Sequence, residues 1–288
     1  MKKIFKFALY ILAIFGFFAL LGNLFDSEEI VLGDRIGVVK ISGFIGEAEK
    51  AVEALEYFRR DQSVKAVVVR VVSPGGMVAP SQEIHDEVMR VAAAKPVVAS
   101  FGAVAASGGY YLSAPATSIV ADPGTITGSI GVIMQFQEYE VLLDKLGFRS
   151  RTVKSGPYKD SGSPLREMTD EDRRLMQGVV DDLFDQFVEA VALGRGMEKD
   201  RVLELADGRI YSGRQALNAG LVDKLGSFHD AIGLAGTLGG LGSSPEIEQW
   251  KPKKGVLMPL LFGEDADSVS EAASAFTAYP AQYVLPGW

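Results

Sequence analysis

Two hydrophobic periods alternate along residues 35–240 of this chain. Runs of β-branched residues such as SVKAVVVRVVS (63–73) are almost continuously apolar, which is typical of a strand covered on both faces. Segments such as GEAEKAVEALEYFRRD (46–61) instead repeat their apolar residues at helical spacing. Strands and helices that follow each other in this regular way predict an α/β fold built on a mainly parallel sheet.

The same patterns place the remaining elements. Strands are predicted at residues 35–45, 63–73, 95–101, 118–123 and 149–156, and helices at 46–61, 80–93, 137–147 and 169–194, with two or three short helices ending near residue 240. Thr169 is the expected N-cap of the longest helix, because three acidic residues follow it in the first turn. Another short helix is expected to begin at Ser107.

An apolar segment, FALYILAIFGFFALLGNLF (7–25), precedes this pattern. Its length is close to the roughly 20 residues that a helix needs to cross a bilayer. Lysines before it and acidic residues after it place the N-terminus in the cytoplasm. We therefore predict an uncleaved anchor in residues 1–25, a linker in 26–34 and a folded domain in 35–242. A cleaved signal peptide is the alternative, but no small-x-small cleavage site is found near Gly22.

Composition removes several classes of function. The net charge is −8 over 288 residues, which argues against nucleic acid as a partner. The chain has no cysteine, so it has no disulfide, thiol nucleophile or thiolate metal site. Only two histidines are present, and no Gly-rich phosphate motif follows a strand. No metal or cofactor is therefore expected.

The C-terminal part of the chain has a different character. Residues 243–288 mix proline, polar and apolar stretches without a sustained period, which predicts an extended or partly disordered extension. Its end, YPAQYVLPGW (279–288), is apolar and suits an extended conformation. We consider the hypothesis that this end enters the groove of a neighbouring subunit as an inhibitory tail.

Ser107 is the candidate nucleophile. It lies in VAASGGYY (104–111), between alanines and glycines that leave room for a substrate carbonyl. The segment SPGG (73–76) ends another predicted strand. Because the carboxyl ends of parallel strands meet at one edge of a sheet, we expect both segments to converge there. A plain turn serine is the alternative reading.

The base for such a serine is less obvious. His85 is predicted in a helix and His229 near the surface, so the sequence gives no reason to pair either histidine with Ser107 as its base. Lys154 and Lys159 lie on a Gly/Pro-rich segment after a predicted strand. A lysine base needs its pKa lowered by about three units, which costs about 4 kcal/mol. Residue patterns alone leave both lysines open as ordinary surface residues.

Several motifs in order give the chain a resemblance to a known family. RVVSPGG, AASGGYYLSAPA, TITGSIGVI, KSGPYKDSGSPLREMT and ADGRIYSGRQALNAGLVDKLG resemble the signal peptide peptidase A family of membrane-anchored serine peptidases over residues 34–235. The resemblance implies a crotonase-like fold related to the Clp protease subunit, preceded by one transmembrane helix. It also implies a Ser-Lys dyad that hydrolyses hydrophobic peptides, such as the remnants of cleaved signal peptides.

The resemblance also implies roles for individual residues. Ser107 would be the nucleophile and Lys159 the general base. The amides of Gly75 and Gly108 would form the oxyanion hole. Ser129, in TGSIG, would orient the lysine amine, although a plain turn serine explains it equally well.

A short member of this family is expected to form a homo-oligomeric ring. The predicted location is the bacterial cytoplasmic membrane, with the catalytic domain on the extracytoplasmic side. Three alternatives remain open: a crotonase-type enzyme acting on acyl-CoA, an inactive membrane-anchored scaffold, and a peptidase that cleaves one specific membrane protein.

Overall fold

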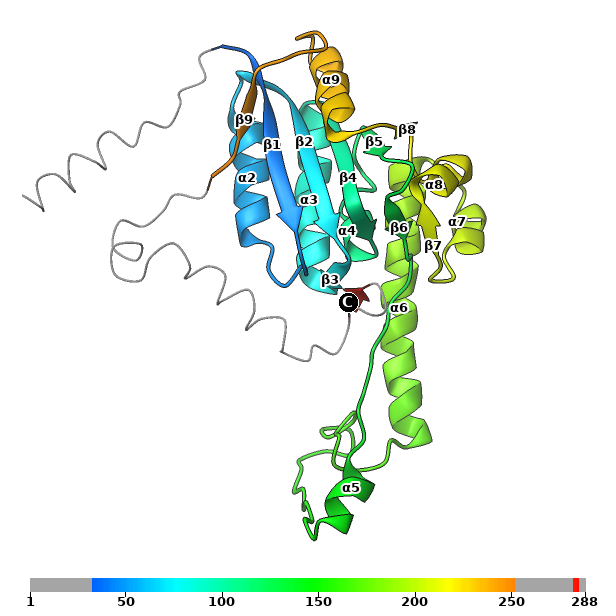
Figure 1. Ribbon diagram of the computed structural model, residues 1–288. Coiled ribbons are helices and arrows are strands. Elements are labelled where there is room, and N and C mark those ends of the chain that lie inside the picture. The colour runs from blue at the N-terminus through cyan, green and yellow to red at the C-terminus, as the bar shows by residue number, and fades with distance from the viewer. Residues whose placement is uncertain (1–32, 252–281, 285–288) are drawn as a thin grey trace, which may run out of the picture.

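The computed structural model describes residues 33–251 and 282–284, and a single sheet organises most of them (Figure 1). Strand order along the main path is β7-β6-β4-β2-β1-β9, and β5 joins β4 to β8. The bounds of these strands are β1 Arg35–Ser42, β2 Val64–Ser73, β4 Val97–Ala106, β5 Ser118–Ala121, β6 Ile126–Gly128, β7 Ile210–Ser212, β8 Lys224–Leu225 and β9 Ile247–Gln249. A separate pair joins β3 Gly75–Met77 to β10 Gln282–Val284.

Helices cover both faces of the sheet (Figure 1). Their bounds are α2 Glu49–Arg60, α3 Val78–Ala94, α4 Gly108–Tyr111, α5 Glu140–Lys145, α6 Asp170–Arg195, α7 Lys199–Leu205, α8 Gly213–Ala219 and α9 Phe228–Leu238. The predicted α/β fold with a mainly parallel sheet is confirmed, because the strand pairs around β1, β2, β4 and β5 are all parallel. Thr169 caps α6 through a capping box with Asp172, as predicted.

The continuously apolar strands divide their side chains between two cores. In β2, Ala66 and Val68 join α9 in a smaller cluster on one face. Val67 and Val69 join the large cluster that includes α2, α3 and α6 on the other face. Alternation of side chains along a strand produces this division. Burial on both faces explains why β2 has no polar stripe.

The central strand β4 carries the feature that matters for function. Its first half pairs with β5, from Val98 to Phe101. Its last residues, 104–106, pair with β6 on the same edge. The two short strands therefore divide one edge of β4 between them. This division brings β6 to the carboxyl end of β4, where Ser107 follows.

The sequence patterns differ from the structure at several elements, and they do not predict the short strands β3, β6, β7 and β8. Residues 149–156 are not a strand, and Val153 is fully exposed, because none of the described strands pairs with this segment. The helix predicted at 137–147 is shortened to α5. The sheet also extends beyond the boundary predicted at residue 242, because β9 pairs in parallel with β1 through Ile36 and Ile247.

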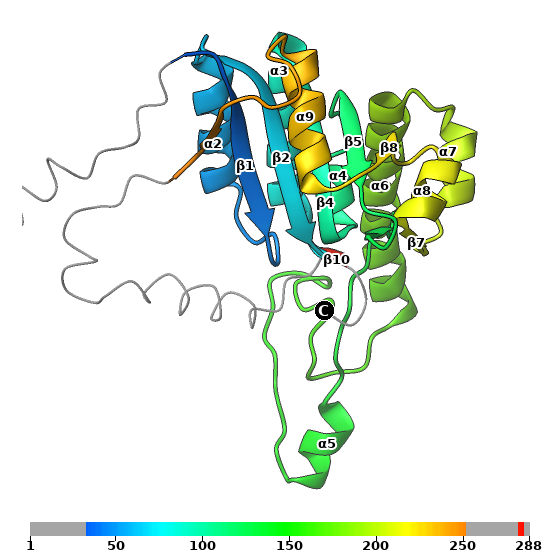
Figure 2. The ribbon, with the colours of Figure 1, turned by 45° about the horizontal axis from the view of Figure 1, so that its top comes forward.

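A long projection leaves the sheet between β6 and α6. It comprises residues 132–168 with α5 near its end, and we call it the arm (Figures 1 and 2). Apolar side chains on the arm are exposed, among them Val141, Leu146 and Phe148 at 65%, 66% and 71%. Residues 7–25, the predicted anchor, lie outside the described residues. Within residues 33–251 and 282–284, no helix has the length and apolar character needed to cross a membrane.

Candidate active site

Ser107 occupies a sharp turn between β4 and α4. Its φ and ψ are 53° and −117°. Its N–H donates to Gly128 O at 2.8 Å, and its carbonyl accepts from Tyr111 N–H at 2.8 Å. The residue has no exposed surface, and its Oγ has no hydrogen-bond partner among the described residues. A buried hydroxyl without a partner costs about 1–3 kcal/mol of folding free energy. Packing alone therefore does not explain why the turn buries this oxygen.

Backbone strain also marks the predicted site. Among the described non-glycine residues, Ser107 and Ser129 are the two with positive φ, at 53° and 51°. Such conformations cost about 1–3 kcal/mol each and cluster at functional sites. Ser129 follows β6 and donates its N–H to Arg209 O at 2.9 Å. Ser129 directly follows Gly128, whose carbonyl accepts the N–H of Ser107, so the two strained serines lie on either side of one backbone contact.

The SPGG segment converges on the same place, as predicted. Ser73 pairs with Ala105 in the register between β2 and β4. A Cβ on Gly109 would lie 3.1 Å from Ser73 O. The absence of a side chain at Gly109 therefore lets the turn after Ser107 pack against the end of β2.

The Gly75 amide, a predicted oxyanion donor, is occupied in this conformation. Its N–H donates to Ser73 Oγ at 3.0 Å. Gly76 is flanked by Gly75 O and Met77 N–H, which both bond the backbone of Ile45. Because backbone groups alternate in direction along a strand, the N–H of Gly76 faces the opposite edge. Of the two glycines, Gly76 thus directs its amide toward the edge of β3 that pairs with β10, and sequence reasoning missed both this and Ser73.

Gly108 fits its predicted role more directly. It is the first residue of α4, where the N–H has no partner within the helix. No acceptor for this N–H is found among the described residues. The amide therefore remains available beside Ser107.

The structure does not bring Lys159 to Ser107 within one chain. Lys159 lies exposed on the arm, and its backbone N–H donates to Gly156 O at 3.3 Å. Its ammonium forms no ion pair or hydrogen bond with the rest of the described chain. Lys154 differs, because its Nζ contacts Asp160 Oδ1 at 2.6 Å and Pro157 O at 2.8 Å. Of the two candidate lysines, Lys159 thus has the uncommitted amine.

The histidines play no part in this site. His85 is buried in α3, where its ring contacts that of Tyr111 in a tilted arrangement with centroids 4.9 Å apart. Burial lowers the pKa of His85, and the hydrogen bond to Asp86 opposes this shift. His229 is exposed near the start of α9. Both positions agree with the structural roles that the sequence suggested.

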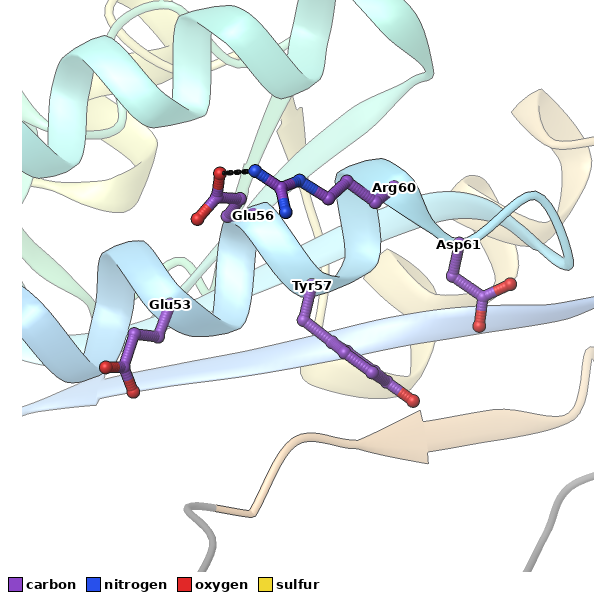
Figure 3. A pocket seen from close by; sticks show the side chains of 5 residues that line it. All are labelled: Glu53, Glu56, Tyr57, Arg60 and Asp61. Atoms are coloured by element: carbon purple, nitrogen blue, oxygen red, sulfur yellow. Dashed lines mark hydrogen bonds and ion pairs between the residues drawn. The ribbon is translucent and has the colours of Figure 1, made fainter.

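A shallow pocket of about 470 Å³ lies elsewhere, on α2 (Figure 3). Its lining residues are Glu53, Glu56, Tyr57, Arg60 and Asp61. Glu56 pairs with Arg60, and Tyr57 donates to Glu248 of β9 at 3.1 Å. Asp61 binds Arg35 at 2.7 Å. The contacts of Tyr57 and Asp61 join the end of α2 to β9 and β1, so we assign the pocket a structural role.

Strand β10 lies beside β3 at the candidate site (Figure 2). The pairing is antiparallel, with Val284 opposite Gly75 and Tyr283 opposite Gly76. β10 also contacts α4, the helix that begins after Ser107. The C-terminal segment thus occupies the strand edge that a bound peptide would use. In the sequence, only the apolar, extended composition of residues 279–288 hinted at this contact.

Comparison with known proteins identifies the family of this site. The model of peptidase family S49 matches residues 89–241. The chain belongs to peptidase family S49. The resemblance to signal peptide peptidase A is confirmed, and by family the chain is a serine protease.

Two curated relatives and one solved structure resemble this chain. It is 44% identical over 209 residues to "Putative protease slr0021" of Synechocystis, covering 72% of this chain and 75% of that protein. It is 44% identical over 179 residues to "Putative signal peptide peptidase SppA" of Enterococcus faecium, covering 62% of this chain and 52% of that one. A ClpP1 mutant of Listeria monocytogenes aligns at a TM-score of 0.47 and 16% identity, covering 68% and 94%. This S49 chain thus spans between half and three quarters of these two relatives.

Proposed function

We propose that this chain is a membrane-anchored serine endopeptidase that hydrolyses hydrophobic peptides, with remnant signal peptides as the substrate class. The observation that carries the proposal is the strained, buried and unpartnered hydroxyl of Ser107 beside the free amide of Gly108. Residues 7–25 supply the anchor, and the positive-inside rule puts the catalytic domain on the extracytoplasmic side of the bacterial membrane.

The chemistry is acyl transfer through a Ser-Lys dyad. The neutral amine of Lys159 takes the proton of Ser107 as Oγ attacks the scissile carbonyl. The oxyanion forms next to the Gly108 amide, with the second N–H supplied by the turn at Gly75 and Gly76. Lys159 then gives its proton to the leaving amine. In the second half-reaction, Lys159 takes a proton from water as the water attacks the acyl-enzyme, and it returns that proton to Ser107 Oγ when the product acid leaves.

We infer that the amine reaches Ser107 from a neighbouring subunit of a homo-oligomeric ring. Among the described residues, Lys159 lies exposed on the arm without an ion pair, and Ser107 Oγ has no hydrogen-bond partner. Apolar side chains along the arm, such as Leu146 and Phe148, would be buried in such an assembly. Ser129 would accept or donate a hydrogen bond to hold the incoming amine.

The peptide is expected to bind as an extra strand on β3. Its main chain would replace β10 in antiparallel pairing with Gly75–Met77. Main-chain hydrogen bonds of this kind carry little sequence specificity. The preference for hydrophobic substrates would therefore come from apolar surroundings of the bound peptide, such as the membrane beside the proposed anchor.

The test uses the full chain in detergent micelles with a fluorogenic apolar peptide. Ser107→Ala and Lys159→Ala are each expected to be inactive. Mixing the two variants before assembly is expected to restore part of the activity, because some sites then combine an intact serine with an intact lysine. No activity in the assembled wild-type chain would overturn the peptidase proposal. Two inactive variants without recovery on mixing would overturn the shared site alone.

A second candidate is a peptidase that cleaves one specific membrane protein through the same dyad. The occupied edge of β3 concerns both candidates, because either substrate would have to displace β10. Hydrolysis of a full-length membrane protein but not of free apolar peptides would support this alternative. The scaffold alternative predicts that Ser107→Ala leaves every function of the assembled chain unchanged.

A further inference from the structure

The segment that carries Lys159 is held by its immediate neighbours. Tyr158 OH donates to Glu171 Oε1, and Ser161 Oγ donates to Asp172 Oδ1. Both acceptors belong to the first turn of α6. Residues on either side of Lys159 are therefore fixed to one rigid helix, while its own side chain is left exposed.

Asp172 is the centre of this arrangement. It is 2% exposed and accepts from both terminal nitrogens of Arg166, at 2.6 and 3.1 Å. It also accepts from Thr169 Oγ1 at 2.8 Å. Hydrogen bonds from Arg166, Ser161 and Thr169 hold the pKa of this carboxyl far below its ordinary value. A helix cap requires neither the ion pair with Arg166 nor the almost complete burial that this carboxylate shows.

Arg166 links this centre to the residue that follows Lys159. Its Nη2 donates to Asp160 Oδ1 at 3.1 Å and to Asp160 O at 3.2 Å. Lys154 Nζ contacts the same Oδ1 at 2.6 Å. Two cations thus bind the Asp160 carboxylate and lower the pKa of that group.

This pairing has a consequence for Lys159. The carboxylate of the adjacent residue, if uncompensated, would attract the protonated ammonium of Lys159. With Lys154 and Arg166 on Asp160, that charge is compensated. The charged and titratable groups around this segment are Lys154, Tyr158, Asp160, Arg166, Glu171 and Asp172.

We propose that Arg166, seated on Asp172 and bound to Asp160, is a positioning residue for the general base, fixing the Lys159 segment and keeping the neighbouring carboxylate from its amine. This inference rests on the proposed role of Lys159. It gives the Arg166–Asp172 pair a catalytic purpose beyond capping α6. Displacement of a catalytic group by about 1 Å can cost roughly 100-fold in rate.

The test measures kcat and KM against pH for the assembled full chain. Arg166→Gln is expected to lower kcat at least tenfold with little change in KM. It should also move the midpoint of the rising limb upward by about one pH unit, since Asp160 then loses a counter-charge. Arg166→Lys should recover part of both effects. Asp160→Asn in the Arg166→Gln background should return the midpoint toward that of the wild type.

Two controls separate this proposal from the function on which it rests. Arg201→Gln removes an exposed pair with Glu204 on α7 and is expected to leave the pH profile unchanged. Lys154→Arg keeps the contact with Asp160 and is expected to stay active, whereas Lys159→Arg cannot give up a proton and should be inactive. An active Lys159→Arg would refute Lys159 as the base.

If Lys159→Arg is inactive but Arg166→Gln changes neither kcat nor the pH midpoint, the positioning proposal is wrong and the dyad stands. The variant Arg166→Gln could instead lose kcat while the midpoint of its pH profile stays that of the wild type, with or without Asp160→Asn. That result would overturn the proposal that Arg166 keeps the Asp160 carboxylate from the Lys159 amine. Circular dichroism and the oligomeric state of Arg166→Gln identify loss of folding. If Arg166→Gln fails to assemble, the single variant Asp160→Asn tests the proposal. Its pH profile should then have a lower midpoint than that of the wild type, and an unchanged or higher midpoint would contradict the proposal.

Discussion

The sheet body and the arm differ in how they treat their large apolar side chains. In the body, strands such as β2 bury both faces, and Phe58 of α2 lies fully buried over β1 where Gly37 leaves room for its ring. In the arm, Phe148 and Leu146 are mostly exposed and polar contacts near Asp172 set the conformation. The body thus buries its large apolar side chains within one chain, whereas the arm leaves several of its apolar side chains exposed, which the proposed assembly would cover.

The largest difference is expected in folding free energy. Phe58→Ala should lower the free energy of unfolding by about 3–5 kcal/mol, because it leaves a cavity between α2 and the sheet. The matched arm variant Phe148→Ala should change it by less than about 0.5 kcal/mol. Urea unfolding of dissociated subunits measures both. Equal losses would mean that the arm packs within its own chain.

Association should show the reverse order. Phe148→Ser is expected to weaken subunit association about tenfold, since apolar arm residues would lose burial between subunits. Leu203→Ser, on α7 of the body at 43% exposure, serves as the control and should have no effect. Sedimentation of the detergent-solubilised chain over a range of concentrations gives the dissociation constant. An unchanged constant for Phe148→Ser would remove the arm from the interface.

Acid should weaken the arm through Asp172. Because its folded pKa lies below the ordinary value of 3.8, its charge stabilises the fold above that pH, and this contribution is lost as pH falls below it. Asp172→Asn should therefore lower Tm by about 2–4 °C at pH 7. The difference between variant and wild type should narrow below pH 4. A difference independent of pH would assign the effect to packing.

The smallest effect is expected at the C-terminal segment. Removing residues 282–288 should lower KM for an apolar peptide about threefold and leave kcat unchanged, because β10 no longer competes for β3. The comparison uses the full chain and the truncated chain at equal subunit concentration. An unchanged KM would show that β10 does not block substrate.

Much of the body could be predicted from local sequence. The two-faced strand at residues 63–73, the α6 cap at Thr169 and the meeting of SPGG with Ser107 all follow from patterns that neighbouring residues determine. The strand predicted at 149–156 failed because a strand needs a partner as well as β-branched residues. β9 was missed for the complementary reason, since its three residues are a strand only beside β1.

The candidate site divides in the same way. Sequence motifs placed Ser107 and Gly108 correctly at the end of β4, because small residues and a strand-to-helix turn are local features. The role of Ser73 as acceptor for the Gly75 amide was invisible, as hydrogen-bond partners depend on how the turn closes.

By itself, the sequence determined the family and the α/β class, and it supplied a candidate nucleophile and two candidate lysine bases, because each depends on residue identity and short-range order. Residue patterns alone left both lysines open, the family resemblance implied Lys159, and the tertiary structure showed how the contacts of the two lysines differ. Folding joined Lys154 to Asp160 and Arg166 but left Lys159 exposed on the arm with an uncommitted amine. Contacts between side chains distant in sequence, such as Asp172 with Ser161, arise from the path of the backbone through space, and no local pattern encodes them.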